Sequence, residues 1–169
     1  MNESKKKDII VYTSIIVFVI LLRVFILTPV KVNGSSMDTT LHDGEIMILN
    51  KIKYNFKKIK RFDIVVVQAK DEKIIKRVIG LPGETLEYKD NTLYINGKIV
   101  NEPFINQPTS DYNIKKLGYT KIPEDCYFVM GDNRKVSVDS RVFGYFTKKD
   151  IIGSASLVLF PFEDFGFKK

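Results

Sequence analysis

The feature that most limits the fold is an apolar segment near the N-terminus. It runs from Ile9 to Val30 and reads IIVYTSIIVFVILLRVFILTPV, and three lysines at positions 5–7 precede it. A helix of ~20 apolar residues is long enough to cross the ~30 Å hydrocarbon core of a bilayer. Pro29 cannot continue a helical hydrogen-bond ladder, so it predicts where the helix ends. We therefore expect one transmembrane helix over residues 9–29.

The lysines predict the orientation of this helix, because positive residues that flank a membrane span stay on the cytoplasmic side. We expect a cytoplasmic N-terminus at residues 1–8 and an extracytoplasmic domain at residues 30–169, held at the cell membrane by a single span. A cleavable signal peptide would have a shorter apolar core and small residues at the cut, and the exit Leu27–Lys31 has neither. A buried helix of a soluble protein would show a polar face, which this segment lacks.

The composition sets limits on the rest of the chain. With 169 residues, of which 44% are hydrophobic and 28% charged, we expect one ordered domain. The net charge of +7 favours anionic partners such as a phospholipid bilayer, and an extracytoplasmic position argues against nucleic acid. One cysteine and one histidine cannot form an internal disulfide or supply a His/Cys metal site, so we expect no metal and no cofactor.

Beyond the apolar segment, short β-rich runs alternate with turn residues. The runs are Glu45–Leu49, Asp63–Gln68, Ile74–Gly80, Thr85–Tyr88, Thr92–Ile95, Lys98–Val100, Cys126–Met130 and Ser154–Phe160. Asn96-Gly97, between two of these runs, is a strong signal for a two-residue hairpin turn. Many short strands at this spacing predict a mostly β domain of antiparallel sheets, barrel-like or folded.

Three segments stand out at the expected surface. Residues 51–61 carry six basic residues, which either touch acidic lipid head groups or form a solvated hairpin tip. Residues 104–119 read as a mobile loop, because they are rich in turn-forming residues. The C-terminal tail holds four phenylalanines, which either lie on the bilayer or cover the last core strand; they are Phe160, Phe162, Phe165 and Phe167.

The stretch VNGSSMDTTLHDGE, residues 32–45, offers a candidate nucleophile in Ser36. A serine hydroxyl attacks efficiently only when a base takes its proton. His42 is close in sequence, but no third group is placed to orient it. A lysine is the other candidate base, because burial lowers a lysine pKa and favours the neutral form.

Lys76 is the lysine that the pattern favours. It lies in the apolar run IIKRVIG, where strand alternation puts it on the side of Ile74 and Val78 and puts Arg77 on the other. Lowering its pKa towards ~8 would cost roughly 3 kcal/mol, which a folded domain can bear. On the pattern alone, a solvent-facing strand residue is the more common interpretation of Lys76.

A third polar stretch, GDNRKVSVDSRVFG at residues 131–144, lies between two expected strands. It packs carboxylates, arginines and serines between glycines, which favours a turn network over a core strand. Taken alone, it is a polar loop held by an Asp–Arg pair.

Together the three stretches, in this order after an apolar segment, resemble the type I signal peptidases, membrane-bound Ser–Lys endopeptidases of family S26. The resemblance spans nearly the whole chain, and the short single-span form is similar to the Gram-positive members. It implies a β domain of the kind shared with repressor-type proteases. It also implies a serine endopeptidase that removes signal peptides from exported precursors, the secretory preproteins, by cutting after small residues.

The resemblance also implies roles for individual residues. Ser36 would be the nucleophile and Lys76 the general base, with Ser137 bonded to that lysine. Asp139 and Arg141 would hold the third stretch in place. The expected oxyanion and substrate contacts are Gly34, Ser35, Met37, Val30, Val32, Ile74, Ile75, Gly131 and Asp132.

Two positions depart from the family pattern. Thr39 stands where the family usually has proline, so the φ lock of proline is missing and the nucleophile loop is expected to be looser. Gly34 stands where some members have a serine whose hydroxyl helps the oxyanion hole. Backbone N–H groups, including that of Ser36, must then form the hole.

The missing proline keeps a second function open, that of a catalytically impaired assembly or chaperone factor for pili or other surface proteins. An active peptidase with pilin-type substrates also fits the sequence. A cytoplasmic self-cleaving repressor protease fits less well, because such proteins have no membrane segment.

Overall fold

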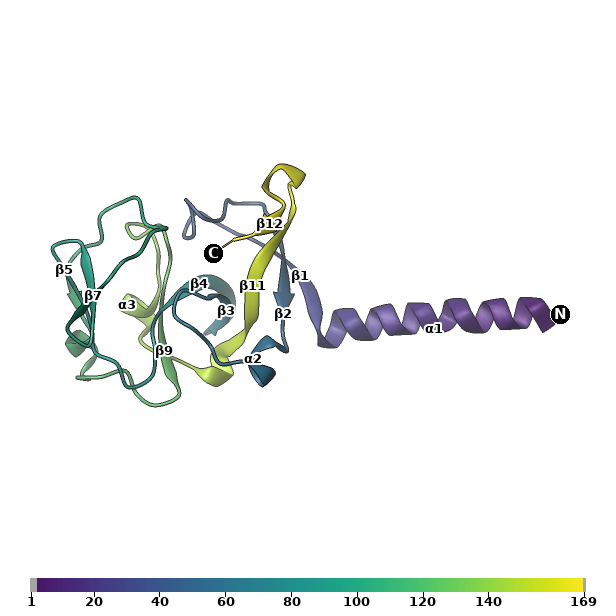
Figure 1. The fold of residues 1–169 in the computed structure, drawn as a ribbon, viewed down its shortest axis with the longest axis horizontal. Helices are drawn as coiled ribbons and strands as arrows, with labels where there is room; N and C mark the ends of the chain where they lie inside the picture. The colour runs from purple at the N-terminus through teal and green to yellow at the C-terminus, as the bar shows by residue number, and fades with distance from the viewer. Residues whose placement is uncertain (1–2, 169) are drawn as a thin grey trace.

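The computed structural model describes residues 3–168, with the backbone alone for residues 3, 4 and 22–25. A long helix, α1 (Glu3–Phe25), projects away from a β-rich body (Figure 1). The predicted helix therefore exists but ends earlier than Pro29, because Leu27–Lys31 form strand β1, paired with β2. Proline also disfavours helical geometry in the residue before it. Within the described residues no helix combines the length and the hydropathy that a membrane span requires.

The body contains a large and a small antiparallel sheet. The large sheet has the order β1-β2-β11-β3-β4-β9-β10, with β12 paired to β11. Its strands are β1, β2 (Ile46–Asn50), β3 (Ile64–Ala69), β4 (Glu72–Gly80), β9 (Cys126–Met130), β10 (Phe146–Thr147), β11 (Ile151–Phe160) and β12 (Gly166–Phe167). The mostly β prediction is confirmed, and β1 lies at one edge of this sheet.

The small sheet has the order β7-β6-β5-β8. Its strands are β5 (Leu86–Lys89), β6 (Thr92–Ile95), β7 (Lys98–Val100) and β8 (Tyr112–Asn113). The predicted hairpin at Asn96-Gly97 is confirmed, with φ of 51° and 74° at the two turn residues. Both are positive, as a type I′ turn requires.

Short helical turns complete the chain. They are α2 (Lys53–Phe56), η1 (Ile114–Leu117), α3 (Ser140–Phe143), η2 (Lys148–Asp150) and η3 (Phe162–Asp164). The segment expected to be a mobile loop, 104–119, holds β8 and η1.

Three apolar clusters form the core. The run Ile64–Val67 in β3 is buried throughout and serves two of them. Ile64 and Val66 pack with Met37 and Leu49, whereas Val65 and Val67 pack in a separate cluster that includes Val129. Alternate side chains of a strand point to opposite faces, so the large sheet is covered on both sides around β3. The third cluster lies against the small sheet and is centred on Tyr88 and Phe128.

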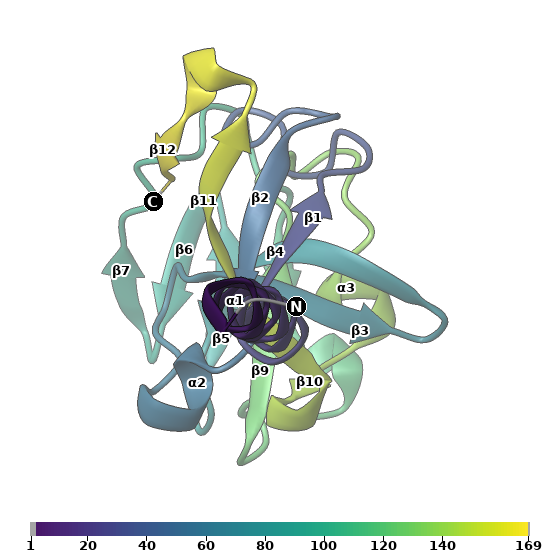
Figure 2. The ribbon, with the colours of Figure 1, turned by 90° about the vertical axis from the view of Figure 1, so that its right-hand side faces the viewer.

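The basic segment and the C-terminal tail can be compared with the alternatives predicted for them. In the basic segment, Lys53 pairs with Asp63 at 3.3 Å and Arg61 pairs with Glu84 at 2.6 Å, so part of its charge is neutralised within the domain. The four tail phenylalanines are 50–81% exposed. The alternative in which their rings cover the last core strand is therefore wrong. α2 lies near the base of α1, whereas β12 lies farther from it (Figure 2).

Candidate active site

The structure brings together two side chains that lie forty residues apart in the sequence. Lys76 Nζ, on β4, lies 2.6 Å from Ser36 Oγ, in the loop between β1 and β2. This is within the distance at which one group can take a proton from the other. The predicted pairing of Ser36 with a buried lysine is therefore present, and the alternative of a solvent-facing Lys76 is wrong.

Burial prepares Lys76 to act as a base. The side chain is 3% exposed. Loss of solvation lowers the pKa of Lys76 from 10.5 to about 8, with the carboxylates of Asp139 and Glu72 opposing this shift. Desolvation penalises the charged ammonium, so the neutral amine becomes accessible near physiological pH.

His42 does not take part in this pair. Its Nδ1 lies 2.9 Å from Asp38 Oδ1, and both side chains are about half exposed. This contact is local to one turn of the loop. The Ser–His alternative therefore has no support in the geometry.

The dyad lies in a cleft of about 480 Å³ between two strands. One wall comes from the end of β1 and the residues after it, and the other comes from the 72–76 part of β4. The expected contact residues that line the cleft are Val32, Met37, Ile74 and Ile75, together with Ser36 and Lys76. Val30 instead packs against the cluster that contains Met37.

Each wall includes part of a strand that has a strand neighbour on one side in the described part of the chain. Among the described strands, β1 is at the sheet edge and is paired with β2. β4 pairs with β3 over Glu72–Arg77, but its partnership with β9 begins only at Arg77. The 72–76 part of β4, beside the C-terminal end of β1, is therefore where an extended peptide can add as a strand.

Two backbone N–H groups near the Ser36 hydroxyl differ in whether they already have an acceptor. The Gly34 N–H donates to Asp43 Oδ1 at 2.7 Å, so it is occupied. No acceptor within the described residues takes the amide N–H of Ser36. Ser36 therefore carries a free backbone donor beside its own hydroxyl, as an oxyanion site needs.

The third polar stretch, residues 131–144, lies beside Ser36 and is held in place by its own hydrogen bonds. Asp139 is fully buried and is held by Arg141, whose Nε and Nη2 both lie 2.9 Å from its carboxylate. The same carboxylate accepts the Gly131 N–H at 3.1 Å. The predicted Asp–Arg pair is formed, and it fixes the start of the stretch to its end.

Gly131 and Ser137 lie close to the nucleophile. A Cβ on Gly131 would overlap with the Ser137 side chain and with the Ser36 carbonyl, so only glycine fits there. The expected hydrogen bond from Lys76 to Ser137 is not formed. The Ser137 hydroxyl is buried without a partner in the described part of the chain, because Lys76 is directed to Ser36.

Asp132 has a different place from the one predicted. It is fully buried, and its carboxylate is bound by Arg77 at 2.6 Å and by Thr40 at 2.6 Å. It therefore holds the loop to β4 and to the nucleophile loop instead of facing the cleft. The sequence pattern did not assign Arg77 or Thr40 to the site, although Arg77 directly follows Lys76.

Thr39 shows why the missing proline matters. Its φ is 93°, a value that side chains other than glycine rarely adopt. The Thr39 N–H donates to Asp38 Oδ1 at 3.1 Å, and its hydroxyl donates to the Phe104 carbonyl at 3.4 Å. Proline has neither this φ nor an N–H, so the loop has a conformation that the usual family residue cannot adopt.

Comparison with known proteins identifies the family of this arrangement. A family model described as signal peptidase, peptidase S26, matches residues 6–160. Across residues 3–168 no cluster of three or more His, Cys, Asp and Glu side chains is placed to hold a metal ion.

Individual relatives agree with the family model. Signal peptidase I S of Bacillus subtilis is 42% identical over 175 residues, covering 96% of this chain and 95% of the relative. Signal peptidase I V of the same organism is 47% identical over 137 residues, covering 75% and 82%. The crystal structure of a signal peptidase I from Enterococcus faecalis is 39% identical with a TM-score of 0.55, covering 58% of this chain and 97% of that one.

Proposed function

The chain belongs to the signal peptidase family, peptidase S26, and on that premise we propose how its residues remove the signal peptides of exported precursors. Ser36 is the nucleophile and Lys76 is its general base. The observation that carries this assignment is the 2.6 Å separation of Lys76 Nζ and Ser36 Oγ. The relatives named signal peptidase I make the enzyme a serine endopeptidase.

The reaction follows from the two side chains. Neutral Lys76 takes the proton of Ser36 as Oγ attacks the carbonyl carbon of the scissile bond, and the proton then passes to the leaving amine. The developing oxyanion is stabilised by the Ser36 N–H. The resulting ester is released when Lys76, neutral again, takes a proton from an attacking water.

Ser137 acts after Ser36 has been acylated and the ester has formed. Once Ser36 Oγ is acylated, Lys76 loses its close hydroxyl partner. The Ser137 hydroxyl is buried and unpaired in the described part of the chain, next to Gly131 and the Ser36 carbonyl. We assign to it the hydrogen bond that holds Lys76 during hydrolysis, while Asp139 and Arg141 keep its loop in place.

The substrate is an extended segment of a secretory preprotein. It adds as a strand between the C-terminal end of β1 and the 72–76 part of β4, where its backbone pairs with both walls of the cleft. Met37, Val32, Ile74 and Ile75 narrow the cleft, which suits the small residues that the family prefers before the cut. Precursors of the pilin type belong to the same chemical class and are included among the substrates to be tested.

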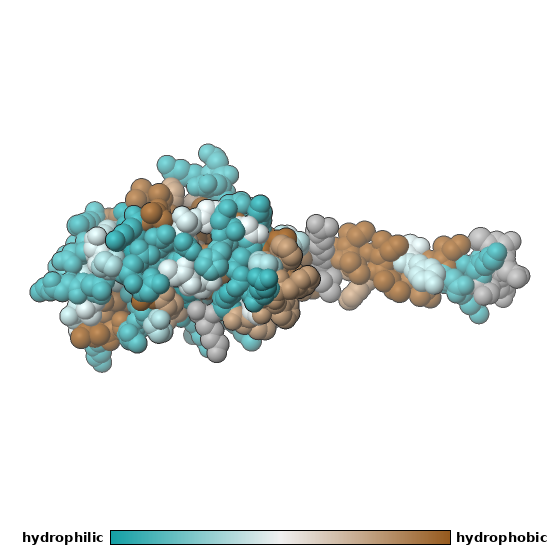
Figure 3. All heavy atoms as spheres, turned by 90° about the horizontal axis from the view of Figure 1, so that it is seen from above, coloured by the Kyte–Doolittle hydropathy of each residue, from teal (hydrophilic) through white to brown (hydrophobic). Residues whose placement is uncertain are grey.

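We further place the protein at the cell membrane, with residues 1–8 in the cytoplasm and the β body outside. The large apolar side chains between Ile9 and Leu21 are 48–66% exposed. Apolar surface runs along much of the helix, and its N-terminal end is hydrophilic (Figure 3). Such surface is unfavourable in water and favours lipid. Carbonate extraction of cell membranes tests this, since a protein released into the supernatant would contradict it.

A cleavage assay tests the catalytic assignment. Full-length protein in lipid is mixed with a precursor that carries an Ala-X-Ala site, and the new N-terminus of the product is identified. We expect the unchanged protein to cut after the small residue, and Lys76→Ala to lose cleavage. Lys89→Ala, at an exposed lysine of β5, is the matched control and keeps full activity. Cleavage by Lys76→Ala at the normal rate would refute Lys76 as the base.

A further inference from the structure

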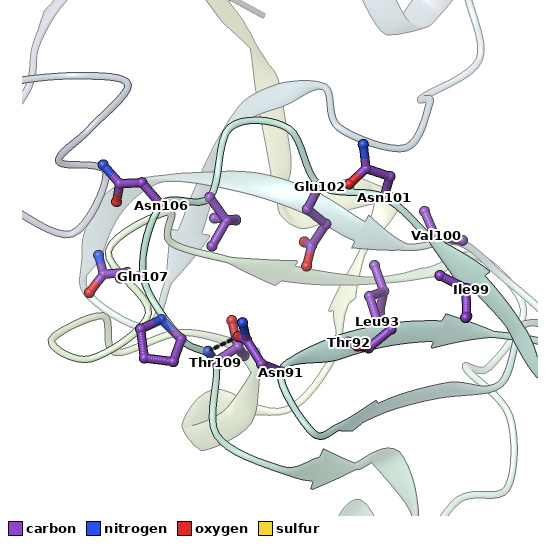
Figure 4. A pocket seen from close by; sticks show the side chains of 12 residues that line it. Asn91, Thr92, Leu93, Ile99, Val100, Asn101, Glu102, Asn106, Gln107 and Thr109 are labelled. Atoms are coloured by element: carbon purple, nitrogen blue, oxygen red, sulfur yellow. Dashed lines mark hydrogen bonds between the residues drawn. The ribbon is translucent and has the colours of Figure 1, made fainter.

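The segment between β7 and β8 forms one wall of a second hollow, of about 570 Å³, separate from the catalytic cleft. Amide and hydroxyl side chains line much of it. Figure 4 shows Gln107 at one end of this hollow and Asn101 at the other. Gln107 also reaches out of this segment to the active site.

Gln107 is joined to the nucleophile through one residue. Its Nε2 donates to Asn133 Oδ1 at 3.0 Å. The Asn133 Nδ2 in turn donates to the Ser35 carbonyl at 3.1 Å, and the Asn133 backbone N–H donates to the Ser36 carbonyl at 3.0 Å. Because Gln107 occupies the oxygen of the Asn133 amide, the nitrogen of that amide must face Ser35.

The contact with the Ser35 carbonyl has a consequence for the oxyanion site. The Ser35 carbonyl and the Ser36 N–H belong to one planar trans peptide, so they point in opposite directions. The Ser35 carbonyl accepts two hydrogen bonds, one from the Asn133 side chain and one from the Asp38 N–H at 3.1 Å, and together they set the direction of the Ser36 N–H. No acceptor in the described residues takes that N–H, so nothing else on the donor side fixes it.

The same segment meets the nucleophile loop at a second point. The Phe104 carbonyl accepts a hydrogen bond from Thr39, and the Phe104 ring lies 3.9 Å from the guanidinium of Arg77. The segment is thus fixed relative to the loop by contacts other than Gln107. Loss of the Gln107 bond alone should leave the segment in place.

From this geometry we propose that Gln107 and Asn133 are positioning residues that orient the Ser36 N–H towards the oxyanion. The relay runs from Gln107 to Asn133, then to the Ser35 carbonyl and through the shared peptide to the donor. The inference rests on the proposed catalytic role of Ser36. It assigns to a segment outside the catalytic motifs a part in stabilising the transition state.

Gln107→Glu is the test variant, because it keeps the shape and removes the donor. A carboxylate only accepts, so Asn133 must turn its nitrogen towards Glu and present its oxygen to the Ser35 carbonyl. The Ser35 carbonyl then loses its Asn133 donor and keeps only the hydrogen bond from the Asp38 N–H, at 3.1 Å. We expect kcat to fall on the order of tenfold to a hundredfold, as when an oxyanion donor is weakened, and KM to stay within about twofold.

Three controls separate this from a structural effect. Asn101→Asp makes the same change of charge at an exposed side chain of the same hollow and keeps full kcat. The rates of wild type and Gln107→Glu are compared on the plateau above the acid limb of the pH–rate profile, so that an effect of the new carboxylate on the Lys76 pKa does not enter the comparison. The double variant Gln107→Glu/Asn133→Ala loses no more than Asn133→Ala alone, because both act through one relay.

Several outcomes would overturn the proposal: unchanged kcat in Gln107→Glu, a rise in KM with normal kcat, or additive losses in the double variant. A wild-type protein that fails to cleave any precursor would instead refute the proposed function. The wild-type assay therefore distinguishes the two failures.

Discussion

Lys76 combines two properties that a strand lysine rarely has. It is buried, and its amine reaches a serine hydroxyl at 2.6 Å. Burial lowers the lysine pKa to about 8, while Asp139 and Glu72 oppose that shift. The pKa of the base is thus a balance between desolvation and nearby carboxylates.

This balance predicts the pH dependence of cleavage. Below the pKa, Lys76 is protonated and cannot accept the Ser36 proton. We expect kcat/KM to rise about tenfold per pH unit between about pH 6 and pH 8 and to level off above the pKa. Initial rates across this range, with a stability check at each pH, give the profile. A flat profile through pH 8 would show that Lys76 is not the base.

Thr39 is the residue at which the chain departs from its family, and its backbone makes the departure testable. Thr39→Gly retains the positive φ and removes the strain of a β-branched residue there, so we expect the midpoint of thermal unfolding to rise and cleavage to persist. Thr39→Pro cannot adopt this φ and loses the bond to Asp38.

We therefore expect Thr39→Pro to lower the unfolding midpoint or kcat relative to Thr39→Gly. Thermal unfolding and cleavage of the two variants, measured side by side, decide it. A proline variant that is both more stable and equally active would contradict the loop conformation described here.

At the scale of elements, one buried ion pair joins three parts of the site. Arg77 on β4 and Asp132 in the third motif are both fully buried, and Thr40 of the nucleophile loop bonds to each. Removing one partner leaves a buried charge without compensation, which typically costs about 3–5 kcal/mol.

Asp132→Asn is accordingly expected to lower the free energy of unfolding by about 3 kcal/mol. The partly exposed pair of Lys168 and Asp164 is the comparison, because solvent reaches both side chains, so Asp164→Asn should cost under about 1 kcal/mol. Denaturant unfolding of both variants in the same detergent measures the difference. Equal costs would show that the buried pair does not join these elements.

The sequence pattern predicts which strands are present better than it predicts where they begin and end. Eight expected strands are present, because alternation and turn residues mark them in the sequence. The apolar pattern extends the expected helix to residue 29, so it misplaces residues 27–29, which pair with β2 as the first part of β1. β8, β10 and β12 have two residues each and are defined by their neighbours, so no local pattern predicts them.

At the scale of the whole molecule, the site is assembled from segments that the sequence separates. Apolar neighbours mark Lys76 as a candidate base, but its approach to Ser36 depends on how β4 faces the loop after β1. Only the family resemblance predicted that pairing. Nothing in the sequence indicated that Gln107 contacts the site, because glutamine is common in polar loops. Asn133, by contrast, lies inside the stretch 131–144 that resembles the family.

The central claim is that Ser36, activated by Lys76, forms the acyl-enzyme. Rapid quenching of full-length protein with a precursor, followed by mass analysis of its peptides, tests this most directly. We predict that the signal-peptide fragment is attached to Ser36, and that Ser36→Ala carries none. Attachment to Ser35 or Ser137, or complete turnover by Ser36→Ala, would contradict the account.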